Sequence, residues 1–146
     1  MTANGTGMSG SLANARAGKA RILAIDDSKT IIAHLKGVLE PRGYRVDTLD
    51  MFIELPTLIK NDPPDLVILD LNMPTIPGIP LGGLIRKFQP HEIPIVVYSS
   101  QPRAELEEAA HALRAAAVVA KGETDDNLIK TVEAVLAIRR SGQQRS

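Results

Sequence analysis

The chain has 146 residues, with 17 Lys and Arg against 17 Asp and Glu, so its formal net charge is zero. This balance gives no basic surface for nucleic acid or an anionic membrane, and two Phe, two Tyr and no Trp make a poor platform for stacking bases. The absence of cysteine excludes disulfides and thiolate metal sites, and no apolar run reaches the roughly 20 residues that span a bilayer. We expect a cytoplasmic protein that binds neither nucleic acid nor membrane.

Composition divides the chain into one domain between two polar ends. Residues 1–19 are small and polar and have no apolar segment of a signal peptide, so we expect a flexible tail. Residues 20–140 carry the apolar pattern of a single domain. With 146 residues, 44% of them hydrophobic, the chain is long and apolar enough to form a hydrophobic core. Residues 141–146 are expected to form a frayed C-terminal tail.

Strand and helix patterns alternate along the predicted domain. Five short apolar segments are predicted as strands: 21–25, 44–49, 66–69, 95–98 and 118–120. Each precedes a segment with apolar residues at helical spacing: 28–40, 50–61, 79–88, 102–115 and 125–138. The alternation predicts an α/β fold with a parallel sheet covered by helices on both faces.

Several residues mark the ends of these helices. Ser28 opens the first helix, and Pro41 and Gly43 stop it. Pro56 lies awkwardly in the second, so that helix either starts near Glu54, which puts Pro56 in its first turn, or is kinked.

The unbroken apolar run of residues 66–69 is typical of a strand buried on both faces, and it ends on Asp70. For a chain of this length we predict a doubly wound, flavodoxin-like sheet of five parallel strands in the order 2-1-3-4-5. Its switch point lies between strands one and three. Asp26 and Asp27 leave strand one there and Asp70 leaves strand three, so the three carboxylates are expected at one edge.

Polar residues also follow the fourth and fifth strands, as Ser99 and Lys121. Taken singly, each residue has an ordinary explanation in helix capping, turn chemistry or a solvated surface. Together, converging carboxylates would repel one another unless a cation neutralised them, and oxygen ligands without His or Cys favour Mg²⁺. A carboxylate beside that ion can attack a phosphoryl group, whose charge a hydroxyl and an ammonium would share.

The chain resembles the response regulator receiver domain, the CheY-like family of two-component signalling, over about residues 20–138. The resemblance rests on the acidic pair, on Asp70 in Asp-x-x-Met-Pro-x-x-x-Gly, on a Ser after strand four and on a Lys after strand five. It implies the following roles: Asp70 as phosphoacceptor, Ser99 as the switch hydroxyl, Lys121 as the lysine that pairs with the phosphoryl group, and Asp26, Asp27, Asp70 and the Asn72 backbone carbonyl as ligands of Mg²⁺.

Two positions depart from the family pattern. Gly122 follows Lys121 where the family usually has proline, and Val118 stands where an aromatic switch residue is expected. Val118 is too small to swing between buried and exposed positions. Neither departure removes a residue needed for phosphorylation.

The resemblance implies a stand-alone bacterial response regulator rather than a metabolic enzyme. Its partners would be a histidine kinase or phosphotransfer protein as donor and a downstream protein target, and the chain would be a monomer or weak homodimer. Three alternatives stay open. They are a pseudo-receiver scaffold independent of phosphorylation, an Mg²⁺-dependent phosphohydrolase, for which Asn72 stands in place of the second Asp, and a flavin binder, which Asp26 and Asp27 disfavour because they repel phosphate.

Overall fold

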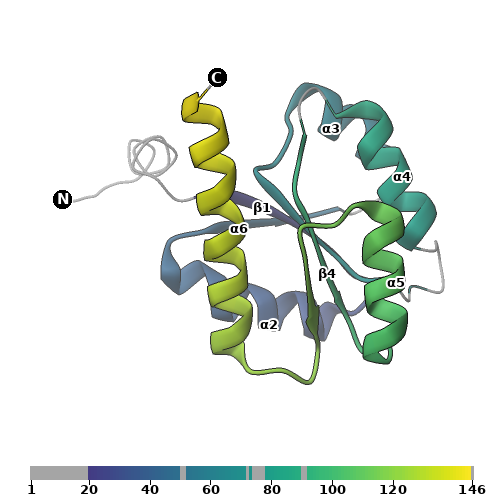
Figure 1. Cartoon of the computed structure of the whole chain (residues 1–146), viewed down its shortest axis with the longest axis vertical. Helices are drawn as coiled ribbons and strands as arrows, with labels where there is room; N and C mark the ends of the chain where they lie inside the picture. Colours follow the sequence, from purple (N-terminus) through teal and green to yellow (C-terminus); the bar gives the residue numbers. More distant parts are fainter. Residues whose placement is uncertain (1–19, 50–51, 72, 74–77, 90–91, 146) are drawn as a thin grey trace.

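A computed structural model describes residues 20–49, 52–71, 73, 78–89 and 92–145 (Figure 1). The expected N-terminal tail, Asp50 and Asn72 lie outside these residues. The strands are β1 Arg21–Ile25, β2 Arg45–Thr48, β3 Leu66–Leu69, β4 Ile95–Ser99 and β5 Ala117–Ala120. They form one sheet in the order β2-β1-β3-β4-β5, and every pair of neighbours is parallel. The predicted fold class and strand order are confirmed.

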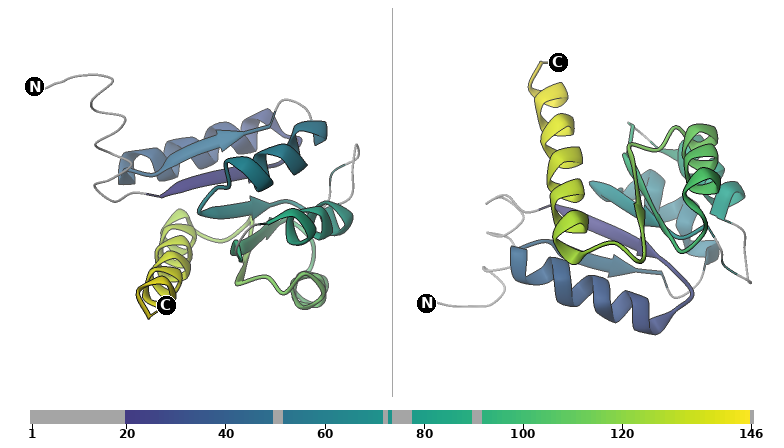
Figure 2. Two further views of the ribbon diagram at one scale, coloured as in Figure 1. Left: turned by 90° about the horizontal axis from the view of Figure 1, so that it is seen from above. Right: turned by 60° about the horizontal axis from the view of Figure 1, so that its bottom comes forward.

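Helices cover both faces of this sheet. The α-helices are α2 Lys29–Leu39, α3 Leu55–Asn61, α4 Gly78–Phe88, α5 Arg103–Leu113 and α6 Asp125–Arg145, with short 3₁₀ turns at η1 Glu40–Arg42 and η2 Phe52–Glu54. One core cluster joins the sheet to α2 and α6, and the other joins it to α3, α4 and α5. Figure 2 shows the same division, with α2 and α6 together on one side. The two clusters sandwich β1, β3 and β4, which explains why these strands are almost wholly apolar.

Helix ends follow the local signals closely in the first half of the chain. The Ser28 Oγ atom accepts a hydrogen bond from the Ile31 N–H at 3.2 Å and so caps α2. Gly43 ends the following turn with φ 94°, a conformation that glycine adopts without steric cost. In the next helix α3 begins at Leu55 with Pro56 in its first turn, so the unkinked alternative is confirmed.

The last two helices do not end where the sequence pattern predicts. We predicted a helix over 102–115, but α5 ends at Leu113 because Arg114 adopts φ 53° and closes the helix. In contrast, α6 continues through residues 141–145, where we expected a C-terminal tail. This segment extends the helix beyond the sheet (Figure 1), although it contains Gly142, a poor helix former. Ile138 lies in the last part of the predicted helix and is 74% exposed.

The paired glycines in α4 have different surroundings. A Cβ atom on Gly82 would lie 2.5 Å from Leu113 Cδ2 of α5, whereas one on Gly83 would meet nothing within 4 Å. Gly82 therefore permits the close approach of α4 to α5. In the part of the chain that the structure describes, no helix is long and apolar enough to cross a membrane.

Candidate functional site at the carboxyl edge of the sheet

Two buried carboxylates leave the central strands at the predicted switch point. Asp26 follows β1 and Asp70 follows β3, and the Asp70 N–H donates a hydrogen bond to the Ile25 carbonyl at 3.0 Å. The Asp26 Oδ1 atom accepts a hydrogen bond from the Ser28 N–H at 2.9 Å, which orients this carboxylate at the start of α2. The backbone of the two strands therefore sets the positions of both carboxylates.

Lys121 follows β5 and contacts both carboxylates at the same edge of the sheet. Its Nζ atom lies 2.9 Å from Asp26 Oδ2 and 3.5 Å from Asp70 Oδ2. The side chains are largely shielded, with exposures of 4% for Asp26, 6% for Asp70 and 17% for Lys121. The Lys121 N–H donates to the Ser99 carbonyl at 2.9 Å, which fixes the loop after β5 against the end of β4. The structure thus brings together three of the predicted site residues.

Ser99 supplies a buried hydroxyl to the same edge. The residue is 0% exposed, and within the described residues its Oγ atom has no hydrogen-bond partner. A buried hydroxyl without a partner costs roughly 1–3 kcal/mol relative to a satisfied one. Such a group is well suited to donate a hydrogen bond to an additional oxygen that enters the site.

The charges at this edge do not balance. Asp26 and Asp70 carry two negative charges, and Lys121 supplies one positive charge between them. Burial strengthens the repulsion between the carboxylates, so a further cation would be stabilising. The oxygen-only donors fit Mg²⁺, which commonly uses one or two carboxylates and keeps several waters.

The full set of predicted Mg²⁺ ligands stays a prediction. Among the described residues, no group of three acidic, histidine or cysteine side chains is gathered closely enough to hold a metal ion. Asp27 is exposed, and the predicted ligand Asn72 lies outside the described residues. Asp26 and Asp70 are therefore the two carboxylates best placed to hold the ion.

Sequence reasoning missed one residue beside the site. The ring of Tyr98 lies with its centroid 5.9 Å from Lys121 Nζ, within the range of a cation–π contact. Burial raises the pKa of the Tyr98 phenol, and the negative charges of Asp125 and Asp26 raise it further. The available signal was an aromatic residue directly before the polar end of β4.

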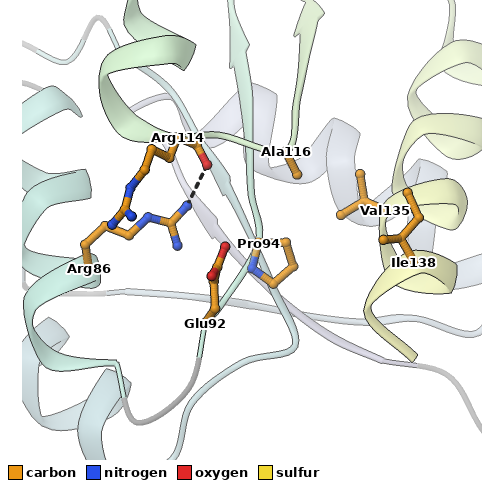
Figure 3. A pocket seen from close by; sticks show the side chains of 7 residues that line it. All are labelled: Arg86, Glu92, Pro94, Arg114, Ala116, Val135 and Ile138. Atoms are coloured by element: carbon orange, nitrogen blue, oxygen red, sulfur yellow. Dashed lines mark hydrogen bonds between the residues drawn. The ribbon is translucent and has the colours of Figure 1, made fainter. Parts of the chain in front are cut away.

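A separate pocket opens at the opposite, amino-terminal edge of the sheet. Its lining includes Pro94 before β4, Ala116 before β5 and Ile138 of α6 (Figure 3). Arg86 is held there by backbone carbonyls, with Nη1 2.6 Å from the Ile93 oxygen and Nη2 3.0 Å from the Arg114 oxygen. Its guanidinium thus fastens the end of α5 to α4 and does not belong to the carboxylate site.

A doubly wound sheet with two buried carboxylates and a lysine at its switch point defines a CheY-like α/β domain. The sequence model of the response regulator receiver domain matches residues 22–133, and the chain belongs to that family. It is a response regulator receiver domain of the two-component type.

Relatives and solved structures agree with this assignment. Protein PilH of Pseudomonas aeruginosa is 28% identical over 119 residues, which cover 81% of this chain and 98% of PilH. The response regulator MprA of Mycobacterium sp. (strain KMS) is 32% identical over 81 residues, which cover 56% of this chain and 35% of MprA. The solved chemotaxis protein CheY4 of Vibrio cholerae has a TM-score of 0.70 and 26% identity, covering 81% of this chain and 99% of that one. A CheY-like receiver from Methanospirillum hungatei shares the fold, with a TM-score of 0.75 at 22% identity, covering 86% of this chain and 99% of that one.

Proposed function

We propose that this domain is a phosphorylation-controlled switch in which Asp70 accepts a phosphoryl group from the phosphohistidine of a histidine kinase or phosphotransfer protein. One observation carries the proposal: Lys121 Nζ contacts both Asp26 and Asp70 at an edge where the Ser99 hydroxyl is buried without a partner among the described residues. This arrangement offers a nucleophile, a cation and a hydrogen-bond donor to one incoming group.

The transfer exchanges one phosphorus bond for another. A carboxylate oxygen of Asp70 forms the new O–P bond as the N–P bond of the donor phosphohistidine breaks. The bonding pair of that bond stays on the imidazole nitrogen, and a proton taken from solvent by the ring makes the released donor histidine neutral. The product is an acyl phosphate on Asp70. Lys121 and the Ser99 hydroxyl then stabilise the phosphoryl oxygens, the former by charge and the latter by a hydrogen bond.

Asp26 and Asp70, with Asp27 and the Asn72 carbonyl, would hold Mg²⁺ in this proposal. The ion, when bound, supplies positive charge that offsets the carboxylates and the phosphoryl oxygens. Asp27 is exposed and would add a further carboxylate directly after Asp26. This chain's own chemistry would be limited to self-phosphorylation and slow loss of the phosphate, as in a switch rather than a metabolic enzyme.

Intact mass spectrometry tests the phosphoacceptor directly. The protein is incubated with acetyl phosphate and Mg²⁺, as wild type, as Asp70→Asn and as Asp126→Asn. Asp126 is an exposed carboxylate paired with Lys130 at 3.0 Å, so it is a matched control. We expect one phosphoryl adduct on wild type and on Asp126→Asn, dependent on Mg²⁺, and none on Asp70→Asn.

A stable wild type that gains no adduct and binds no beryllofluoride would contradict the proposal. That result would favour the alternative of a scaffold that works without phosphorylation. The site geometry supports the switch over the scaffold, since a vestigial site has no reason to keep two carboxylates, a lysine and an unpartnered hydroxyl buried at one edge.

A further inference from the structure

Tyr98 connects the site to one particular face of the sheet. Successive residues of a strand point to opposite faces, so Tyr98 and Ser99 at the end of β4 face different ways. Tyr98 is 4% exposed and packs in the core cluster with residues of α2 and α6, among them Leu35 and Leu128. Its ring also lies 5.9 Å from the ammonium of Lys121. One side chain therefore contacts both the catalytic cation and the core beneath α2 and α6.

The first turn of α6 lies within electrostatic reach of the same ring. Asp125 is the first residue of α6, and its charge acts on the Tyr98 phenol together with that of Asp26. The Asp125 Oδ1 atom lies 2.8 Å from His34 Nε2 of α2. Asp70 is therefore linked through Lys121 to Tyr98, whose ring packs with residues of α2 and α6 and whose phenol is affected by the charge of Asp125.

On the opposite face of the sheet, β5 carries Val118 rather than an aromatic residue. Val118 of β5 packs against the core cluster of α3, α4 and α5, and it is half-buried. A valine has a single, strongly restricted χ1 angle and is short, so it has no second position into which it can rotate. Gly122, after Lys121, is exposed, and a Cβ atom added to it would meet nothing within 4 Å. Gly122 therefore has no packing contact through which a shift of Lys121 could be passed on.

We infer that Tyr98, through its contact with Lys121, transmits the phosphorylation state of Asp70 to the junction of α2 and α6. A cation–π contact depends on the distance between ammonium and ring. When Lys121 shifts towards a phosphoryl group on Asp70, the contact with Tyr98 changes, and so does the electrostatic environment of Asp125 at the start of α6. The inference rests on the proposed function.

Amide hydrogen exchange, measured before and after beryllofluoride and Mg²⁺ are added, tests this role. In wild type we expect exchange to change by about threefold or more over residues 125–131 and 29–39, the size that follows from a contact of cation–π strength. Tyr98→Leu removes the ring and is expected to lose this response, whereas Tyr98→Phe keeps the ring and retains it. Tyr44→Leu removes the other buried tyrosine of the same core cluster and serves as the matched control.

A second, exposed pair of variants keeps the test decisive if Tyr98→Leu fails to fold. Asp125→Asn removes the charge that acts on Tyr98 and pairs with His34, so we expect it to weaken the response in both α6 and α2. Asp126→Asn, on the next residue, is expected to leave both responses intact. A wild-type response confined to α4 and α5, or a folded Tyr98→Leu that responds like wild type, would overturn the inference.

Intact mass separates this inference from the proposed function. Tyr98→Leu is expected to acquire the phosphoryl adduct of Asp70, because it retains the carboxylates, Lys121 and Ser99. An adduct without the helix response in this variant, while wild type and Tyr98→Phe show both, supports the transmission role. Wild type with neither adduct nor beryllofluoride response would overturn the proposed function and this inference together. Wild type with an adduct but no response at α2 and α6 would overturn the inference alone.

Discussion

Lys121 is the residue on which the electrostatics of the site depend. Its ammonium is the cation that contacts both Asp26 and Asp70 in the described part of the chain, and all three side chains are largely buried. Removing one partner of a buried ion pair is strongly destabilising because an uncompensated charge stays behind. The same residue therefore serves stability before phosphorylation and, in the proposed switch, charge balance after it.

Lys121→Gln is expected to lower the free energy of unfolding by about 3 kcal/mol at neutral pH. Because the carboxylates then lack their counter-ion, Mg²⁺ is expected to raise the melting temperature of this variant more than that of wild type. Lys130→Gln is the matched control, since Lys130 is exposed and its ion pair with Asp126 contributes little. Thermal unfolding with and without Mg²⁺ checks the prediction, and an equal effect of Mg²⁺ on both variants would count against a metal site at Asp26 and Asp70.

At the scale of elements, the packing of α4 against α5 determines what each glycine of α4 contributes. Sequence reasoning treats Gly82 and Gly83 alike, as residues that weaken a helix. The structure separates them, because only Gly82 lies against a buried side chain of the neighbouring helix, Leu113.

Gly82→Ala and Gly83→Ala form a matched pair that measures this packing. Both gain about 1 kcal/mol of helix propensity, so their difference isolates the contact with Leu113. We expect Gly83→Ala to be more stable than wild type, and Gly82→Ala to be less stable than Gly83→Ala by about 1–3 kcal/mol, the usual cost of overpacking a core. Urea unfolding of the two variants gives this difference. Equal stabilities would mean that Leu113 moves aside at no cost.

The stability of the whole molecule at alkaline pH is expected to depend on Tyr98. Burial and two nearby carboxylates raise its pKa in the folded protein, so the phenol keeps its proton at a pH where the unfolded chain, with a pKa of about 10, has lost it. The raised pKa of Tyr98 therefore makes its full contribution to the free energy of unfolding below about pH 10. This contribution declines as the pH rises from there through the pKa of Tyr98 in the folded protein.

Chemical unfolding between neutral pH and the alkaline limit of the fold tests this dependence. Tyr98→Phe has no phenol to ionise, so we expect its free energy of unfolding to fall less steeply above about pH 10, by up to 1.4 kcal/mol per pH unit for one proton. Tyr44→Phe keeps Tyr98 and is expected to keep the contribution of that residue to the slope. Parallel curves for wild type and Tyr98→Phe would contradict the assigned pKa shift.

The fold class, the strand order and the approximate place of the site can all be predicted from the amino-acid sequence. Apolar runs and helical spacing recur along the chain, and breakers such as Gly43 mark element ends, so these features depend on neighbours in sequence. Asp26, Asp70 and Lys121 were predicted together because parallel strands present their carboxyl ends at one edge. That argument needs only topology, and the structure bears it out for these three side chains.

How individual side chains meet could not be predicted from the sequence. The tertiary structure places Asp27 in solvent, sets the Tyr98 ring beside Lys121, leaves Ile138 of α6 exposed and brings Leu113 against Gly82. Each of these relations joins segments far apart in sequence or depends on how far an element extends beyond the core. Their distances follow from the simultaneous packing of several elements around the sheet, which local periodicity and residue preferences do not encode.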